Sequence, residues 1–267
     1  MEQLQALGMQ KPLLLLFGAG CLISCHKDAS NPQKGWTWFG TQNTGVYNYV
    51  LINANQVLSN TDTEELHVGV SAAFIDSINN QLTAVRALSV NNFLIEPGRD
   101  STYSYNYADG ESAKGNQLFG SNVVVTIHGA DESDSISNMI YVPKRLTTII
   151  ENYPDTVSIS KGIELNWMPD SANTWGNVMV QLFYYSALSM KSDSTMPKNI
   201  STLNITVPDN GTYYLSSYYL STFPKNAFVG ITIARGTQSQ AVLPVSRKRI
   251  YYFSSASVST PPVRLTK

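Results

Sequence analysis

The stretch LHVGVSA, residues 66–72, alternates apolar residues with polar or small ones. Successive side chains of a β-strand point to opposite faces of the sheet, so the alternation sends Leu66, Val68 and Val70 to one face. His67 then points to the other face. The stretch predicts a strand of an antiparallel sheet that is buried on one side and solvated on the other.

The same period of two recurs as VVVTIH at 123–128, IELNW at 163–167, VMVQL at 178–182 and VGITI at 229–233. Clusters of Pro, Gly, Asn and Asp separate these segments, and such clusters mark turns. No convincing amphipathic helix follows the N-terminal apolar segment. We therefore expect an all-β protein built from antiparallel β-sandwiches.

A domain boundary is expected between Pro143 and Pro154, because the stretch between these prolines lacks clear alternation. A new series of strands begins at residues 156–159. The expected organisation is an N-terminal β-sandwich-like domain at residues 36–150 and a C-terminal one at residues 151–267.

Short motifs in the second half resemble those of immunoglobulin and fibronectin type III domains. Trp167 follows an early strand, and the DNGTY segment at 209–213 is similar to the Asp-x-Gly-x-Tyr turn of that superfamily. The resemblance implies a sandwich with an inward-facing tryptophan. Because the chain lacks the paired cysteines of antibody-type domains, another sandwich topology stays open. Such folds serve adhesion, pilus assembly, sugar binding and spacing, so the resemblance does not choose a function.

A short apolar run begins at Leu13, after the basic residue Lys11, and ends at Cys25. The run is shorter than the roughly 20 apolar residues that a membrane-spanning helix needs. A basic residue followed by a short apolar core is typical of a cleaved export signal. The N-terminal segment therefore predicts export rather than a membrane-spanning anchor.

The LISC segment at 22–25 closes this run and resembles the lipobox of bacterial lipoproteins. The resemblance implies that a signal peptide at residues 1–24 is removed, that Cys25 carries the lipid, and that residues 25–35 form a tether. Cys21 is the second candidate, with flanking residues that depart further from the lipobox. An ordinary secretory signal is the remaining alternative.

In Gram-negative lipoproteins an Asp directly after the cysteine usually marks retention at the inner membrane, and here the residue is His26. The resemblance thus implies a lipid anchor in the outer membrane, on its periplasmic face or at the cell surface. Two or three acyl chains make a durable anchor, because each buried methylene contributes about 0.8 kcal/mol. The membrane is therefore an expected partner of the chain.

Composition argues against nucleic acid as a partner. Only 14% of the residues are charged and the net charge is −1, so the chain carries no basic field. The two cysteines, Cys21 and Cys25, lie in or at the end of the signal, which leaves no disulfide and no thiolate ligand in the folded part. His67 and His128 fall on different predicted strands. We therefore expect no metal and no cofactor.

Catalytic motifs are weak. The segment SISK at 158–161 matches the Ser-x-x-Lys spelling of penicillin-binding enzymes, but a strand does not bring that lysine to the serine, and the companion motifs are missing. The acidic pairs Glu64-Glu65 and Asp131-Glu132 fall in turn-like polar stretches. We expect no enzymatic activity.

Aromatic residues are the remaining indication of a ligand. Tyr103, Tyr105 and Tyr107 occupy alternate positions and so share one face of a predicted strand. If this face is exposed, it is the first place to test for glycan binding, because stacked rings with polar tips suit sugars. The alternative is that the rings belong to the core.

These observations favour a non-enzymatic surface lipoprotein that acts as a binding or adhesion module, with a glycan or another envelope protein as its ligand. A structural subunit of a fimbria or envelope assembly is the alternative. It would need an exchangeable terminal strand, and residues 249–258 are the place to look for one. A secreted hydrolase is the third class, which would need convergent carboxylates in a cleft.

Overall fold

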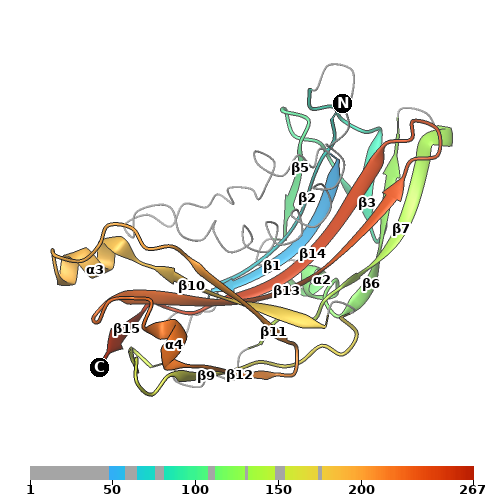
Figure 1. Ribbon diagram of the computed structural model, residues 1–267. Coiled ribbons are helices and arrows are strands. Elements are labelled where there is room, and N and C mark those ends of the chain that lie inside the picture. The colour runs from blue at the N-terminus through green and yellow to red at the C-terminus, as the bar shows by residue number, and fades with distance from the viewer. Residues whose placement is uncertain are drawn as a thin grey trace, which may run out of the picture. The chain divides into compact units, whose positions relative to one another are not determined.

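The computed structural model describes residues 48–57, 65–75, 81–107, 112–129, 132–147, 154–173 and 176–267. The expected signal peptide, Cys25 and the tether lie outside the described residues. Residues 47–267 group into one compact unit. This part of the chain is mostly β (Figure 1), which confirms the all-β prediction.

The predicted strands at 66–72, 123–128, 163–167, 178–182 and 229–233 all coincide with strands of the structure. The described strands are β1 (Tyr49–Val57), β2 (Glu65–Ala73), β3 (Ala87–Val90), β4 (Phe93–Ile95), β5 (Tyr103–Asn106), β6 (Ser121–His128), β7 (Ser135–Val142), β8 (Thr156–Ser158), β9 (Ile163–Asn166), β10 (Asn177–Tyr184), β11 (Leu203–Pro208), β12 (Thr212–Leu215), β13 (Phe228–Val242), β14 (Arg249–Ser259) and β15 (Val263–Thr266).

One sheet runs through the whole unit, and we call it the long sheet. Its strands follow the order β11-β10-β13-β14-β1-β2-β5, and β15 pairs with β13 and β8 beside this path. The pairs are antiparallel except β1 with β14 and β15 with β8, which are parallel. The long strands β13 and β14 form the central hairpin of the sheet (Figure 1).

A smaller sheet of order β4-β3-β6-β7 covers one end of the long sheet. Its β3 and β4 are joined by Asn91 and Asn92, which both have positive φ. Two such residues suit the tight two-residue hairpin turn, and asparagine tolerates that backbone conformation better than most residues. Between the two sheets lies the first core, with Val50, Ile52 and Val70 on the long sheet.

The second core lies on the same face of the long sheet, at its other end. It contains Val180, Ile231 and Ile233 from the long sheet, and it is covered by the two-stranded sheet of β9 and β12. The short helix α4 (Ser217–Leu220) adds the buried Leu220. Both cores therefore share one continuous sheet.

Most residues of the first core precede the expected boundary near residue 150, and most residues of the second core follow it. The long sheet, however, contains strands from both sides of this boundary. Strand β14 supplies Ile250 and Tyr252 to the first core and Val258 to the second. Leu146 lies on the N-terminal side of the boundary, yet it packs in the second core. The N-terminal strand β1 also pairs along its whole length with β14.

Among the described residues, three short α-helices occur, although the sequence shows no convincing amphipathic helix. They are α2 (Ser112–Asn116), α3 (Ser186–Ser192) and α4, and η2 (Glu132–Asp134) is a single 3₁₀ turn. Each connects strands and is too short to show an amphipathic period in the sequence. Within the described ranges, no helix has the length and apolar character required to cross a membrane.

Candidate functional site

The three tyrosines of the predicted strip lie against the first core. Tyr103 is 1% exposed and Tyr107 is 9% exposed, while Tyr105 is half-buried and packs against the same cluster. The Tyr103 hydroxyl donates to the backbone oxygen of Val85 at 2.9 Å. The rings of Tyr105 and Tyr107 meet edge to face at 5.0 Å. The strip therefore belongs to the core, and its rings do not form the exposed platform that glycan stacking requires.

The candidate ligands of a metal site are also dispersed. His67 is exposed on β2, whereas His128 ends β6 and its Nδ1 lies 3.0 Å from the Ser135 hydroxyl. Within the described part of the chain, no three His, Cys, Asp or Glu residues come together as metal ligands would. Glu64 and Asp131 of the acidic pairs lie outside that part.

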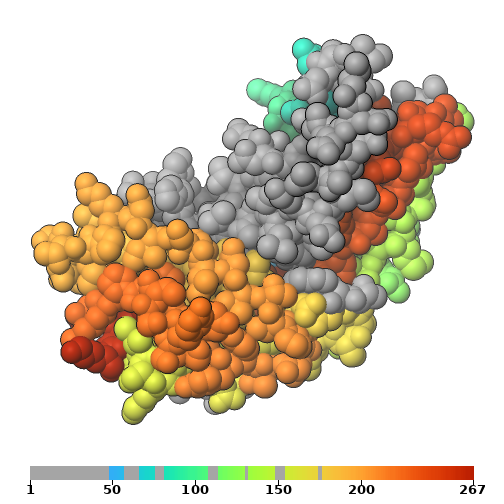
Figure 2. All heavy atoms as spheres, in the orientation of Figure 1, coloured from blue at the N-terminus to red at the C-terminus, as the bar shows by residue number. Residues whose placement is uncertain are grey.

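The buried Asp134 holds a loop in place. Its Oδ1 accepts hydrogen bonds from the backbone amides of Val245 and Ser246, at 2.9 and 3.0 Å. These amides belong to the tip of the β13–β14 hairpin, which lies at the surface at the upper right of Figure 2. The carboxylate thereby fixes the hairpin end against η2.

Ser158 of the Ser-x-x-Lys motif forms hydrogen bonds with the Ser160 hydroxyl and with the backbone oxygen of Lys267.

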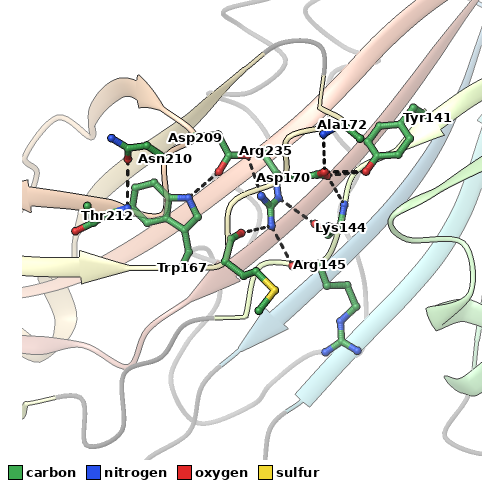
Figure 3. Close-up of polar contacts among 11 residues, drawn as sticks. Tyr141, Lys144, Arg145, Trp167, Asp170, Ala172, Asp209, Asn210, Thr212 and Arg235 are labelled. Atoms are coloured by element: carbon green, nitrogen blue, oxygen red, sulfur yellow. Dashed lines mark hydrogen bonds and ion pairs between the residues drawn. The ribbon is translucent and has the colours of Figure 1, made fainter.

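A buried ion pair lies between the two cores (Figure 3). Arg235 of β13 and Asp209 of the β11–β12 turn approach to 2.8 Å, with side chains 0% and 2% exposed. The Arg235 guanidinium also donates to the backbone oxygens of Lys144, Arg145 and Met168. A buried charge is expensive unless it is paired and hydrogen-bonded, and these contacts supply both.

Three further side chains complete this polar network. Trp167 is 2% exposed, as the immunoglobulin-like motif implies for its tryptophan, and its Nε1 donates to Asp209 at 2.8 Å. The buried Asp170 accepts from the Tyr141 hydroxyl and from the Lys144 amide (Figure 3). Burial, followed by the hydrogen bond to Asp170, raises the pKa of Tyr141 to about 12. The network ties the segments at 141–147 and 167–170 to the long sheet.

We did not anticipate Arg235 from the sequence, although a signal was present. The inward positions of β13 read Val229, Ile231, Ile233 and then Arg235, so a charged residue continues an apolar alternation. An arginine at such a position requires buried acceptors. Its partners come from segments far away in the chain, and no local pattern identifies them.

The opposite face of the long sheet has another chemistry, and we call it the polar face. One row of paired residues crosses five strands as Asn106, Gly69, Asn53, Ser255 and Gly236. None of these side chains is larger than asparagine. An ideal Cβ on Gly69 would lie 2.9 Å from the Asn106 Oδ1 and 3.4 Å from the Asn53 Oδ1. The two amide groups therefore flank the glycine.

The next row, two residues along each strand, includes His67, Asn55, Ser257 and Ala234. The Ser257 hydroxyl donates to the Asn55 Oδ1 at 3.0 Å. Further along, Thr232 and Ser259 lie 2.8 Å apart through their hydroxyls. Thr232 and Ser259 are 2% and 4% exposed, so these two hydroxyls satisfy each other inside the protein.

The five polar side chains at the middle of this face are Asn53, Asn55, Asn106, Ser255 and Ser257, and we call them the neutral patch. Asn106 is exposed and the other four are half-buried. On the seven strands of the main path, the charged residues that alternate onto this face are the first residues of β2 and β14. The middle of the face therefore carries many hydrogen-bonding groups and no formal charge.

Aromatic rings border the neutral patch on β14. The rings of Tyr251 and Phe253 are stacked, with centroids 6.3 Å apart and planes 6° apart. Phe253 precedes Ser255 by two residues and so points to the same face, where its side chain is buried. The two layers that form the cores both lie on the other side of the long sheet. Neither the tyrosine strip nor the alternation of single strands pointed to the neutral patch, because its residues come together only when β5, β2, β1 and β14 pair.

No family model matches the chain, and no curated protein matches it significantly.

Proposed function

We propose that the chain is a non-enzymatic lipoprotein, anchored in the outer membrane through Cys25, that acts as a binding or adhesion module. The observation that carries the binding role is the neutral patch, which offers hydrogen-bonding groups on the strands of a rigid sheet. A sheet holds such groups at fixed spacing, so little conformational freedom is lost when a ligand binds. The ligand of this proposal is a glycan or another envelope protein.

The two-domain arrangement is part of the proposal. Each core corresponds to one immunoglobulin-like or fibronectin type III-like sandwich, and the two sandwiches share β13 and β14. Arg235 supports this arrangement, because its hydrogen bonds join segments from both halves of the chain. A rigid pair of this kind suits a module that presents a surface away from a membrane.

The alternatives receive less support from the geometry. The segment suggested as an exchangeable strand is β14, which lies between β13 and β1 and pairs with both. Its removal would open the centre of the sheet rather than an edge. For a hydrolase, the buried carboxylates of Asp170 and Asp209 are engaged in holding backbone and Arg235, not in facing a substrate.

Two measurements test the proposal. Cys25→Ala is expected to abolish labelling by radioactive palmitate and to release the protein from the membrane fraction, whereas Cys21→Ala leaves both unchanged. The purified chain is then applied to arrays of oligosaccharides and of envelope proteins, and selective binding to either array is expected. Unchanged labelling of Cys25→Ala contradicts the anchor, and the absence of any ligand on both arrays contradicts the binding role.

A further inference from the structure

We infer that the outer face of the two-stranded sheet of β9 and β12 binds a sugar unit, an inference that rests on the proposed function for its ligand class but not on the neutral patch. This sheet forms the lowest layer in Figure 1. Leu165 and Leu215 point from it into the second core. Because side chains alternate along a strand, Glu164 and Tyr214 point outward, and both residues are exposed.

The Tyr214 ring is exposed and at the same time held in place. The residue is 56% exposed, and its hydroxyl donates a hydrogen bond to the backbone oxygen of Lys161. Gly162 makes room for this contact, because an ideal Cβ there would lie 2.9 Å from the Tyr214 hydroxyl oxygen. The ring is thus anchored at its backbone in β12 and at its hydroxyl near the start of β9. An aromatic ring fixed in this way loses little conformational freedom when a ligand stacks on it.

Hydrogen-bonding side chains lie beside the ring on the same face. Glu164 is the cross-strand partner of Tyr214, and Asn166 is the partner of Thr212. Side chains paired in this way have Cβ atoms about 4.5–5.5 Å apart, so the Glu164 carboxylate lies within reach of a ligand on the ring. The Thr212 hydroxyl donates to the Glu164 Oε1 at 3.3 Å and orients the carboxylate. The face therefore combines an aromatic surface with a carboxylate and an amide.

This combination matches the chemistry of a sugar. The C–H face of a sugar ring is apolar and stacks on an aromatic ring, whereas the hydroxyls at its rim need polar partners. A carboxylate accepts hydrogen bonds from several hydroxyls, and an asparagine amide both donates and accepts. Tyr214 would hold the ring face, and Glu164 and Asn166 would bind the hydroxyls.

The size of the face also favours a sugar over a protein. Its two strands pair over four residues each, which gives a length of about 13 Å, and they lie about 4.8 Å apart. These dimensions correspond to one or two sugar rings. A stable protein interface buries about 800 Å² on each partner, which is much more than this face offers. Anions such as nucleic acids would also meet the negative charge of Glu164.

The test applies the full chain in detergent to arrays of oligosaccharides and of envelope proteins, followed by calorimetric titration with the oligosaccharide that binds best. Tyr214→Ala removes the ring and should weaken binding by about tenfold or more. Met139→Ala is the control, because it removes an apolar side chain that is 65% exposed on β7, and its affinity should stay within about twofold. Thermal unfolding verifies the fold of each variant, and Glu164→Ala replaces Tyr214→Ala if the latter does not fold.

The results separate this inference from the proposed function. Oligosaccharide binding that Tyr214→Ala weakens and Met139→Ala preserves supports the inference. Oligosaccharide binding that Tyr214→Ala leaves intact overturns it, although the proposed function stands. An envelope protein whose binding is lost in Tyr214→Ala, with no oligosaccharide bound, overturns the carbohydrate class and retains the binding role. If neither array yields a ligand, the proposed function itself fails, and the inference fails with it.

Discussion

Adjacent residues of β13 point to opposite faces of the long sheet and meet different partners there. Ile233 and Arg235 point toward the cores, where Ile233 is 1% exposed and Arg235 is bound by a carboxylate and three backbone oxygens. Thr232 and Gly236 alternate onto the polar face, where the Thr232 hydroxyl meets that of Ser259. The same strand therefore carries an apolar face with one compensated charge and a polar face with none.

The comparison separates two reasons for polar residues in a sheet. On the core face, a polar group persists only if its partners are built around it, because burial without them is costly. On the polar face, charged residues would be the ordinary means of keeping a sheet surface soluble. The neutral patch carries amides and hydroxyls instead.

The largest effect is expected where the core face carries its charge. Arg235→Met should lower the free energy of unfolding by about 3–5 kcal/mol, because it leaves Asp209 buried without its counter-ion. Chemical denaturation measures the loss. Arg86→Met is the matched control, since Arg86 pairs with Glu132 at 3.0 Å with side chains 54% and 83% exposed. It should cost about 1 kcal/mol or less, and equal costs for the two variants would contradict the assigned role of Arg235.

A tyrosine of the strip provides the second test. Tyr103→Ala should cost at least about 3 kcal/mol, because it removes a large buried ring from the first core. Tyr218 is 75% exposed, and Tyr218→Ala should change stability by less than about 0.5 kcal/mol. Both variants are compared in urea unfolding. A small loss of stability in Tyr103→Ala would contradict the burial of this ring and would indicate that the tyrosine strip is exposed.

Neighbouring residues of β13 allow the faces to be compared directly. Ile233→Ala should cost about 2–5 kcal/mol through the cavity that it leaves in the second core. Thr232→Ala, one residue away on the polar face, should cost about 1 kcal/mol through the lost contact with the Ser259 hydroxyl. The difference between the two midpoints of thermal unfolding measures the asymmetry of the sheet, and its absence would contradict the assignment of faces.

The smallest effect is expected at an imperfection of the core face. The Tyr252 hydroxyl is buried and has no hydrogen-bond partner in the described part of the chain, and burial raises the pKa of this group to about 12. Tyr252→Phe removes an unsatisfied polar atom, so stability should be unchanged or rise by up to about 1 kcal/mol. A loss of more than 1 kcal/mol in denaturant unfolding would show that the hydroxyl has a partner after all.

The local pattern was sufficient for the strands and for part of the core. Alternation placed Val68 and Val70 inward and His67 outward, and β2 confirms this. It was insufficient for the tyrosine strip, because one strand's period says that Tyr103 and Tyr107 share a face but not which face is covered. The short helix α3 was not predicted, because its seven residues contain too few turns to show a helical period.

The sequence by itself determined the all-β class, the position of the main strands and the sharing of faces within each strand, because a period of two is a property of neighbouring residues. Only the tertiary structure decided that β14 pairs with the distant β1, that Arg235 meets Asp209 and the backbone at 144–145, and that the neutral patch assembles from β5, β2, β1 and β14. These features depend on contacts between residues far apart in the chain. Alternation constrains the direction of a side chain, whereas strand pairing chooses its neighbours.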